Sequence, residues 1–393
     1  MVGLTRRSVL GSLLPIAVAA GSTPPSSHPG DHASSLPSGV RDSIDELFAM
    51  PPGQIGPGYA LGIIKDGDLV FARGYGFANL EDATPIATGT AFHIASLSKQ
   101  FTGAAVALSI LDGRVALEDS IARYLPEFAT FAADVRVKHL IYMTSGLPEY
   151  TSIPRASGLP WFSPYRFTTA EAIAAVAAAR RTEFAPGTRW AYSNTNYMLL
   201  TEIVSRAQGV TFGHFVKERV FSPLGMTSSL VDDDGLSLIP KRAIGYAPKT
   251  PEIVRDLGSV GISVGEDSSS WLRMNRVSPH YGGSGVFTTI EDWLRWDRNW
   301  TSHQLAGPQF TDLMHSRMRF DHPKDNDAFG LVFGDYAGRT RIWYSGGDLD
   351  ASSYVARFPD QRLTVCCLSN NPAGQAEQRV TSLLGVLVSA SLL

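Results

Sequence analysis

The chain has 393 residues, of which 44% are hydrophobic and 18% charged, and its 34 lysines and arginines nearly balance its 37 aspartates and glutamates. This length allows a large core, and the charge balance excludes a strong electrostatic field for nucleic acid or an anionic membrane surface. The nine histidines form no HExxH pattern and no tight cluster with cysteine, so no metal site is predicted.

The N-terminus reads LTRRSVLGSLLPIAVAAGSTPPSS, with an Arg6-Arg7 pair, an apolar run from Val9 to Ala20 and then a Pro/Ser segment. The apolar run is too short to span a bilayer comfortably, and the arginine pair is typical of a twin-arginine export signal. An amphipathic helix is the alternative, but the run has no polar face. We expect residues 1–35 to be a signal peptide and linker, the mature protein to be periplasmic or secreted, and no transmembrane segment to remain.

The first elements after this linker are a helix and a hairpin. Val40, Ile44 and Phe48 have helical spacing within residues 38–50. Two β-rich runs over 59–79 then flank Asp66-Gly67, a dipeptide that favours a two-residue hairpin turn.

From Ser96 onward the apolar residues recur every three or four positions, and Asp112-Gly113 ends the pattern. The sequence therefore predicts a helix with Ser96 at or near its first turn. Unpaired backbone N–H groups and the positive end of the helix dipole favour developing negative charge there.

Residues from about 117 to 330 are rich in helical segments and turns, whereas the last part of the chain reads as strands followed by a helix from about 376 to 392. Cys366 and Cys367 are adjacent in one apolar strand, point to opposite faces and are expected to be buried without a disulfide. We predict an α+β fold in which strands from both chain ends form one antiparallel sheet flanked by helices. Residues 36–393 would form one domain, with a sheet subdomain at 36–116 plus 330–393 and a helical subdomain at about 117–329.

Ser96 and Lys99 form a Ser-x-x-Lys pattern, which on a helix brings the two side chains to the same face, whereas Ser98 points away from Lys99. Such a serine can act as a nucleophile if burial disfavours the charged lysine, so that the amine takes the hydroxyl proton. A helix-cap serine beside a solvated lysine is the structural alternative.

Two further motifs stand far from this one in the sequence. Tyr192 and Asn194 would face the same side of an extended segment, where a phenol can transfer protons and an amide can hold the lysine or a carbonyl. Ser345-Gly346-Gly347 follows a strand, and a backbone N–H there can join that of Ser96 in an oxyanion hole. The alternatives are a core tyrosine with a turn asparagine, and glycines at a bulge.

With these motifs in this order, the chain resembles the serine hydrolases related to class C β-lactamases, a family that includes penicillin-binding D-Ala-D-Ala carboxypeptidases, D-aminopeptidases and esterases. The resemblance covers about residues 40–392 and extends to connecting segments such as DGRVALEDSIARYLPEF, PGTRWAYSNTNYMLL and YGGSGVFTTIEDWLRW. It implies a β-lactamase/transpeptidase-like fold and cleavage of an ester or amide through an acyl-enzyme. It also implies a small-molecule or peptide substrate and no cofactor.

By this resemblance Ser96 is the nucleophile, Lys99 its proton acceptor, and Tyr192 the residue that protonates the leaving group. Asn194 would contact the lysine or the substrate, and the N–H groups of Ser96 and Gly347 would form the oxyanion hole. Residues 344–347 would bind substrate, namely Tyr344, Ser345, Gly346 and Gly347.

Relatives carry lysine or histidine where this chain has Tyr344, and often histidine where it has Met143. A neutral tyrosine attracts no substrate carboxylate, and Arg341 should face the other side of the strand. This argues against β-lactams and against peptides with a free carboxylate, while leaving acyl transfer itself plausible.

Two rival interpretations remain. GISVG at 261–265 fits a nucleophile elbow with Ser263, although that motif needs a preceding strand and a following helix. Alternatively, the fold has lost catalysis and binds cell-wall fragments or a protein partner.

Overall fold

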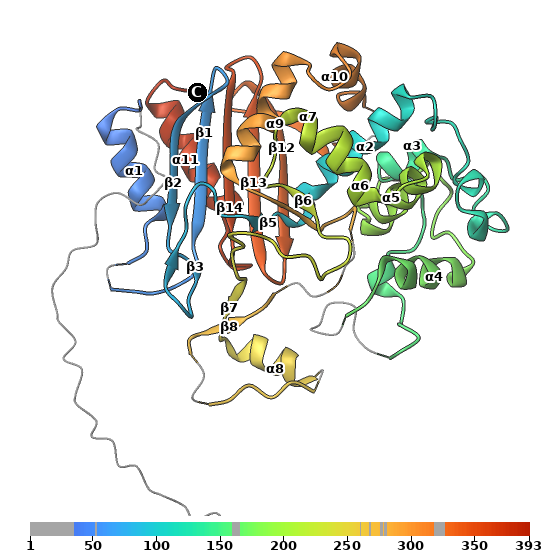
Figure 1. Cartoon of the computed structure of the whole chain (residues 1–393), viewed down its shortest axis with the longest axis horizontal. Coiled ribbons are helices and arrows are strands. Elements are labelled where there is room, and N and C mark those ends of the chain that lie inside the picture. The colour runs from blue at the N-terminus through green and yellow to red at the C-terminus, as the bar shows by residue number, and fades with distance from the viewer. Residues whose placement is uncertain are drawn as a thin grey trace, which may run out of the picture.

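The computed structural model describes residues 35–51, 53–158, 166–259, 261–266, 269–275, 278, 281–317 and 327–393. Apart from residue 35, the predicted signal segment lies outside the described residues. Within them, a seven-stranded antiparallel sheet runs through the centre in the order β10-β11-β12-β13-β14-β1-β2 (Figure 1). Its strands are β1 (Tyr59–Lys65), β2 (Asp68–Tyr75), β10 (Asp327–Ala328), β11 (Leu331–Tyr336), β12 (Arg339–Asp348), β13 (Ala351–Phe358) and β14 (Leu363–Ser369).

Pairing of β1 with β14 joins strands from the two ends of the chain, as predicted. The predicted hairpin is also confirmed: Lys65 pairs with Asp68, and the turn residues Asp66 (φ 54°) and Gly67 (φ 85°) both have positive φ. Two consecutive positive φ values define a type I′ turn, which Asp-Gly adopts readily.

Helices cover both faces of the sheet. One face packs against α1 (Ser38–Phe48) and α11 (Ala376–Ser389), which the sequence also predicted (Figure 1). On the other face lie α2 (Lys99–Leu111) and α9 (Ile290–Ser302), and the rest of the helices lie beyond these two or at the periphery (Figure 1). These are α3 (Val137–Ile141), α4 (Thr169–Ala179), α5 (Asn194–Gln208), α6 (Phe212–Val216), α7 (Ser222–Leu224), α8 (Pro251–Ser259) and α10 (Pro308–Met314).

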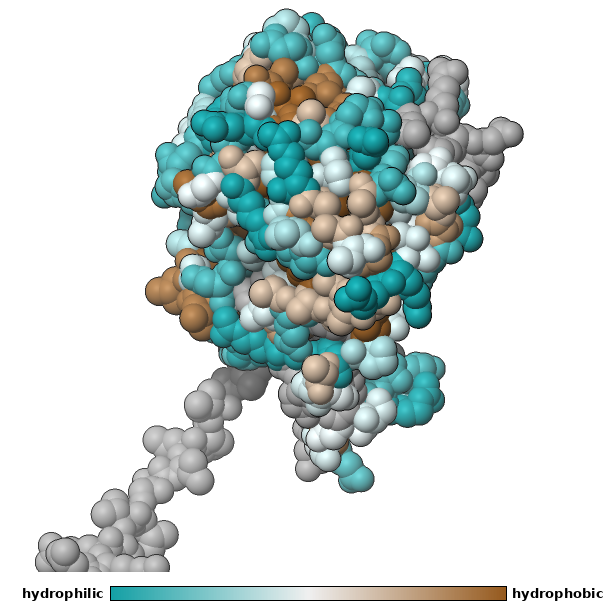
Figure 2. All heavy atoms as spheres, turned by 90° about the vertical axis from the view of Figure 1, so that its right-hand side faces the viewer, coloured by the Kyte–Doolittle hydropathy of each residue, from teal (hydrophilic) through white to brown (hydrophobic). Residues whose placement is uncertain are grey.

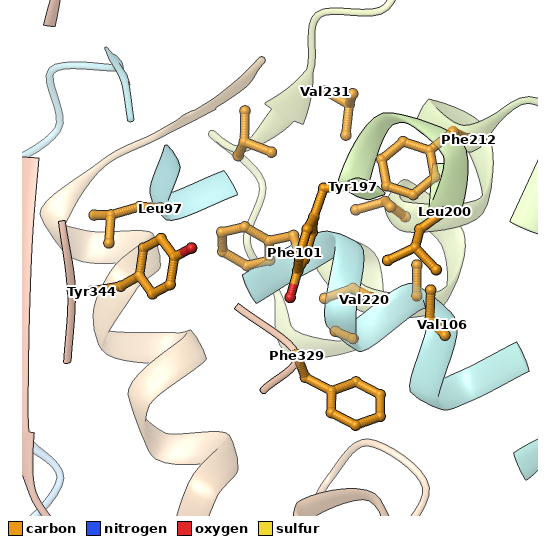
Figure 3. Packing of buried hydrophobic residues seen from close by; sticks show 14 of the residues in the cluster. Leu97, Phe101, Val106, Tyr197, Leu200, Phe212, Val220, Val231, Phe329 and Tyr344 are labelled. Atoms are coloured by element: carbon orange, nitrogen blue, oxygen red, sulfur yellow. The ribbon is translucent and has the colours of Figure 1, made fainter. Parts of the chain in front are cut away.

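Helix α2 is the centre of the larger core. Its residues from Lys99 to Ser109 are all buried, so the helix is enclosed on every side rather than amphipathic. Figure 3 shows Phe101 and Val106 of this helix among the side chains of Tyr197, Leu200 and Val220 from neighbouring segments. The helix begins three residues later than Ser96, because Ala95–Ser98 form a separate 3₁₀ turn, η1.

The chain also contains short strands outside the central sheet, and all of them except Phe77–Asn79 lie outside the segments predicted as strands. They form the sheets β5-β9-β6, β3-β4 and β7-β8. Their bounds are β3 (Phe77–Asn79), β4 (Thr84–Pro85), β5 (Phe92–His93), β6 (Leu230–Val231), β7 (Tyr246–Pro248), β8 (Trp271–Arg273) and β9 (Val286–Thr288). The α+β fold class is confirmed, whereas the division into two subdomains stays a prediction.

The fold tests the predictions made for the two cysteines and for Ser263. Cys366 and Cys367 are buried, free and adjacent on β14, with one in each of the two apolar clusters. Ser263 is exposed in an irregular segment that follows helix α8 instead of a strand, which excludes the nucleophile elbow.

The surface on the side of α3, α4 and α5 is mostly hydrophilic, with separate small apolar patches (Figure 2). Over the described ranges, every helix is too short or too polar to cross a membrane.

Candidate active site

Ser96 lies in η1, and the structure distinguishes it from its neighbour Ser98. Ser96 is partly exposed, whereas Ser98 is fully buried and its hydroxyl accepts the backbone N–H of Val286 at 3.0 Å. The residue before Ser96, Ala95, has a φ of 47°, an uncommon value for a residue with a side chain. This tight turn presents the Ser96 hydroxyl to solvent at the N-terminal end of α2.

Lys99 is fully buried at the first position of α2. Its Nζ lies 3.1 Å from Ser96 Oγ, 2.9 Å from Asn194 Oδ1 and 2.8 Å from the carbonyl oxygen of Gly283. All three partners are uncharged oxygen atoms, so the buried amine forms no ion pair with them. The predicted alternative of a solvated lysine is therefore wrong.

Tyr192 approaches Ser96 from the solvent side. Its hydroxyl lies 2.8 Å from Ser96 Oγ and 3.3 Å from Asn194 Oδ1, and its side chain is 44% exposed. The backbone between the two motif residues is extended at Ser193, as predicted, with φ −148° and ψ 120°. Asn194 itself is the first residue of α5, not part of a strand, and the Ser193 side chain caps that helix.

Glu149 is a site residue that the sequence analysis missed. Its Oε2 accepts the backbone N–H groups of Asn194 (2.8 Å) and Thr195 (3.2 Å) and the Ser193 hydroxyl (3.2 Å). Burial raises the pKa of this carboxyl above its usual value, although those hydrogen bonds act in the opposite direction. Glu149 thereby fixes the helix turn from which Asn194 reaches Lys99.

The third motif lies on β12, beside η1. Pairing with β11 ends at Trp343, so residues 344–348 have a strand partner on one side only, although β12 is not an edge strand of the whole sheet. A side chain at Gly346 would meet Ile94 O at 2.5 Å, Ser353 Oγ at 2.3 Å and Ser96 N at 3.1 Å. Gly346 thus allows β12 to approach η1 closely, while Gly347 lines the space next to Ser96.

Two cavities meet at Ser96, Tyr192 and Gly347. The small cavity, about 160 Å³, extends past Asn194, Tyr281, Ser284 and Asp348. The large cavity, about 390 Å³, extends past Trp190, Asp327, Trp343, Tyr344 and Ser345. Among the described residues, neither cavity is lined by lysine, arginine or histidine.

Tyr344 is almost fully buried, and its hydroxyl lies 3.5 Å from Asp327 Oδ2. Burial raises the pKa of this phenol well above its usual value, and the nearby Asp327 acts in the same direction. Arg341 lies away from both cavities, with its guanidinium over the Trp343 ring and 3.3 Å from Tyr354 OH. The large cavity therefore has no cation at the position where relatives are expected to have one.

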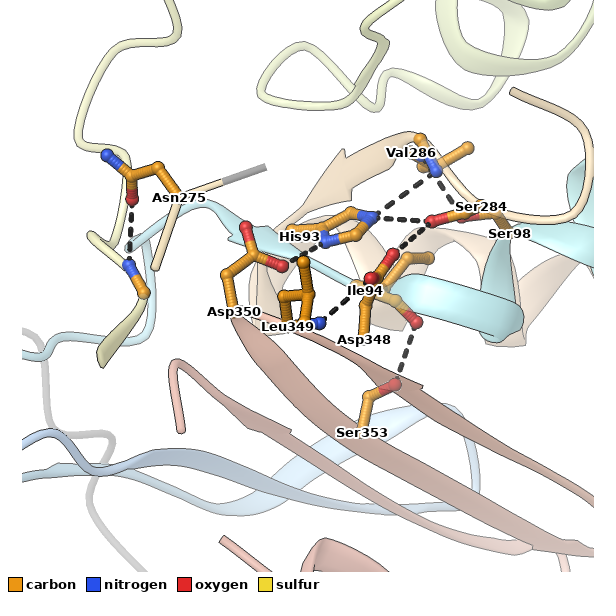
Figure 4. A network of polar contacts seen from close by, with 12 residues as sticks. His93, Ile94, Ser98, Asn275, Ser284, Val286, Asp348, Leu349, Asp350 and Ser353 are labelled. Atoms are coloured by element: carbon orange, nitrogen blue, oxygen red, sulfur yellow. Dashed lines mark hydrogen bonds and ion pairs between the residues drawn. The ribbon is translucent and has the colours of Figure 1, made fainter. Parts of the chain in front are cut away.

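Behind the small cavity, a polar network connects the Gly283 segment to the end of β12 (Figure 4). His93 Nδ1 lies 2.7 Å from Asp350 Oδ1, and His93 Nε2 lies 2.8 Å from Ser284 Oγ. The Ser284 hydroxyl in turn lies 3.2 Å from Asp348 Oδ2. Ligand-type atoms of His93, Asp348 and Asp350 fall within 4.8 Å of one another, but both ring nitrogens already have partners, so hydrogen bonding accounts for the cluster.

The three distant motifs thus come together, with Ser96, Lys99, Tyr192 and Asn194 in direct contact and Gly347 beside them. Ser345 and Tyr344 line the large cavity, and Gly346 acts as a spacer. The sequence missed Glu149, Asp327 and the His93 network. The catalytic roles assigned to these residues stay predictions.

Known proteins share sequence and fold with this chain. The model of the family described as Beta-lactamase matches residues 44–388. Penicillin-binding protein 4* of Bacillus subtilis is 28% identical over 314 residues, covering 78% of this chain and 66% of that protein. A D-aminopeptidase of Gluconobacter oxydans is 27% identical over 328 residues, covering 83% of this chain and 58% of that protein. The chain thus spans between about half and two-thirds of these relatives' lengths.

Solved structures share the fold at lower identity. The D-amino acid amidase of Ochrobactrum anthropi, complexed with L-phenylalanine amide, superposes with a TM-score of 0.73 at 20% identity and covers 90% of this chain and 99% of its own. A penicillin-binding protein of Bacillus halodurans gives a TM-score of 0.70 at 22% identity and covers 90% of this chain and 100% of its own.

Proposed function

This chain belongs to the beta-lactamase family, and on that premise we propose that it is a serine hydrolase that cleaves an ester or amide bond through a Ser96 acyl-enzyme. One observation carries the proposal: Lys99 Nζ and Tyr192 OH lie 3.1 and 2.8 Å from Ser96 Oγ, where two cavities meet. A nucleophile with proton acceptors in reach and space on both sides has the geometry that acyl transfer needs.

The first half of the reaction forms the acyl-enzyme. The Ser96 hydroxyl gives its proton to Lys99 as Oγ bonds to the carbonyl carbon, and the carbonyl electron pair moves onto the oxygen. The N–H groups of Ser96 and Gly347 stabilise this oxyanion. When the tetrahedral intermediate collapses, the leaving group departs with a proton from Tyr192, and the proton that Lys99 took from Ser96 replaces it on the Tyr192 oxygen.

The second half repeats these steps with water. Tyr192, deprotonated by Lys99, removes a proton from a water molecule that attacks the acyl carbon, and Ser96 leaves with its proton restored. Asn194 holds the Lys99 amine and the Tyr192 hydroxyl at fixed positions relative to each other, because its Oδ1 contacts both.

The substrate class follows from charge. The described lining of both cavities has carboxyl groups and no cationic side chain, which disfavours substrates that depend on a free carboxylate. The relatives named D-aminopeptidase and D-amino acid amidase support an amide of an amino acid or short peptide. Esters with small acyl groups would be alternative substrates of the same site.

Labelling with a fluorophosphonate probe tests the nucleophile. We expect covalent labelling of the wild-type protein and of Ser263→Ala, which removes an exposed serine outside the site, and no labelling of Ser96→Ala. Labelling that survives Ser96→Ala would reject the proposal. If no probe, p-nitrophenyl ester or amino acid amide reacts with the wild-type protein, the remaining interpretation is a binding protein for cell-wall fragments or a partner.

We also propose that residues 1–35 direct export through the twin-arginine route, on the strength of Arg6-Arg7 and the short apolar run. A fusion of this segment to a reporter enzyme that works only after export should be active in cells. Replacement of both arginines by lysine should abolish that activity, and an unaffected fusion would reject the twin-arginine assignment.

A further inference from the structure

A buried carboxyl in the large cavity has an unsatisfied oxygen. Asp327 is 4% exposed and lines the cavity next to Tyr344. Among the described residues its Oδ1 has no hydrogen-bond partner, and Oδ2 has only the Tyr344 hydroxyl at 3.5 Å, the outer limit of a hydrogen bond. Burying a carboxyl oxygen without a donor is unfavourable, and the described residues supply none for Oδ1, so a bound molecule with a donor group would be favoured there.

The position of this carboxyl is fixed by the sheet. Asp327 on β10 pairs with Val332 on β11, which pairs with Trp343 on β12. All three residues line the large cavity, so the backbone hydrogen bonds of three strands hold the carboxyl in its wall. A group held on regular strands is preorganised for a ligand.

The cations of the described residues do not neutralise this carboxyl. Lys99 is close enough to act on Asp327 electrostatically, but its Nζ is held by Ser96, Asn194 and Gly283. The described lining of the cavity contains no other cation and is rich in aromatic rings, namely Trp190, Tyr192, Trp343 and Tyr344. Aromatic faces attract cations, and a carboxylate beside them adds the opposite charge.

We propose that the large cavity binds a protonated amine of the substrate and that Asp327 is the carboxylate that receives it. The inference rests on the proposed function in taking this bound molecule to be the substrate of Ser96. Relatives are expected to have a lysine or histidine at position 344, which would attract a substrate carboxylate. This chain has the neutral Tyr344 beside the acidic Asp327, so its cavity would attract a positive charge instead. The substrate class is therefore an ester or amide with an ammonium group near the scissile bond.

Ionisation of Asp327 should make the affinity of the wild-type protein for an amine depend on pH. Burial raises the pKa of Asp327 to about 7, and the titratable groups that interact with it are Lys99 from α2, Tyr197 from α5 and Tyr344 from β12. A bound ammonium favours the carboxylate form. Affinity for an amine that stays protonated should thus rise about tenfold between pH 6 and pH 8, while affinity for a neutral analogue stays constant.

The direct test measures binding by isothermal titration calorimetry to the full-length Ser96→Ala protein, so that the result does not depend on turnover. The probes are 2-phenylethylamine, the neutral 2-phenylethanol and the anionic 3-phenylpropanoate. We expect the amine to bind about tenfold or more tightly than the alcohol, and an added Asp327→Asn substitution to remove this preference without weakening the alcohol. Failure of the proposed function would appear separately, as wild-type protein that binds the amine but hydrolyses no ester or amide.

Three results would overturn the inference: equal affinities for amine and alcohol, tighter binding of the anion, or loss of the amine preference with Asp348→Asn instead of Asp327→Asn. The last result would place the amine in the small cavity. If Asp327→Asn does not fold, the pH profile of amine binding to the parent protein decides, and a flat profile from pH 6 to 8 rejects the role of Asp327.

Discussion

Glu149 holds the turn that carries Asn194: its Oε2 accepts the Asn194 backbone N–H at 2.8 Å, and the same oxygen also accepts from Ser193 and Thr195. Among the described contacts, the Glu149 side chain makes none with Ser96. Any effect of Glu149 on the reaction at Ser96 therefore passes through Asn194. The carboxylate caps the N-terminus of α5. By fixing Asn194, it also positions Lys99.

Glu149→Ala should lower kcat for p-nitrophenyl acetate about tenfold to a hundredfold, because Asn194 would no longer keep Lys99 in place. It should also lower the free energy of unfolding by about 1 to 2 kcal/mol, the usual effect of losing a cap. Urea unfolding and steady-state kinetics measure the two effects. Glu149→Gln keeps one acceptor oxygen and should recover most of the activity. An equal loss of kcat in both variants would show that the negative charge of Glu149 matters more than its hydrogen bonds to the α5 turn.

Tyr192→Phe should separate substrates by their leaving groups. The substitution removes the hydroxyl that we assign to leaving-group protonation, and the 44% exposed ring leaves the core unchanged. p-Nitrophenolate departs without a proton, whereas the amine of an amide needs one. We expect the acylation rate with an amino acid amide to fall about a hundredfold or more and the burst rate with a p-nitrophenyl ester to fall far less, while deacylation slows for both substrates. A uniform fall for both would contradict this role.

Lys99→Met should nearly abolish acylation. The change replaces the buried amine by an apolar side chain of similar length, so packing around α2 is kept. Stopped-flow measurement of p-nitrophenol release should show a burst rate reduced about a hundredfold or more. Ser96→Ala provides the background rate, and a Lys99→Met burst close to the wild-type burst would remove Lys99 from the mechanism.

The buried pair of His93 and Asp350 should be a stability element. Both side chains are 3% exposed and their atoms lie 2.7 Å apart. Removing one partner leaves the other without this buried hydrogen bond, which costs about 1 to 3 kcal/mol. Asp350→Asn should therefore lower the urea midpoint strongly, and Asp350→Asn combined with His93→Asn should be less destabilised than the sum of the single changes. Strict additivity would mean that the two side chains do not depend on each other.

The residues predicted from the sequence and those that were missed differ in a physical way. Ser96 and Lys99 are three positions apart, and Tyr192 and Asn194 two, so local backbone geometry alone places each pair on one side. The long strands and helices could also be predicted, since their apolar periodicity reflects burial, whereas strands of two or three residues are too short to show a period.

The missed residues act through contacts between distant parts of the chain. His93 and Asp350 are 257 positions apart, and Glu149 and Asn194 are 45 apart. A single carboxylate in a polar stretch has no period and no spacing to detect. Asp327 is the extreme case, because nothing in its neighbourhood in the sequence indicates that three strands would bury it beside Ser96.

Asp327 should also make the stability of the protein depend on pH. Its ordinary pKa is 3.8 and burial raises the pKa in the folded protein to about 7. The folded state thus holds its proton more tightly than the unfolded state. The stabilisation from this group is fully present below about pH 4 and is lost as the pH rises to about 7.

Asp327→Asn should remove this loss, because an amide does not ionise. As the pH rises from 4 to 7.5, the unfolding free energy of Asp327→Asn should increase relative to that of the wild type. The increase should be on the order of 4 kcal/mol at most. Urea unfolding of both proteins at several pH values measures this difference, in which all other titrating groups cancel. A difference that stays constant over this range, or that changes in favour of the wild type, would show that the Asp327 carboxyl is already ionised and partnered in the folded protein.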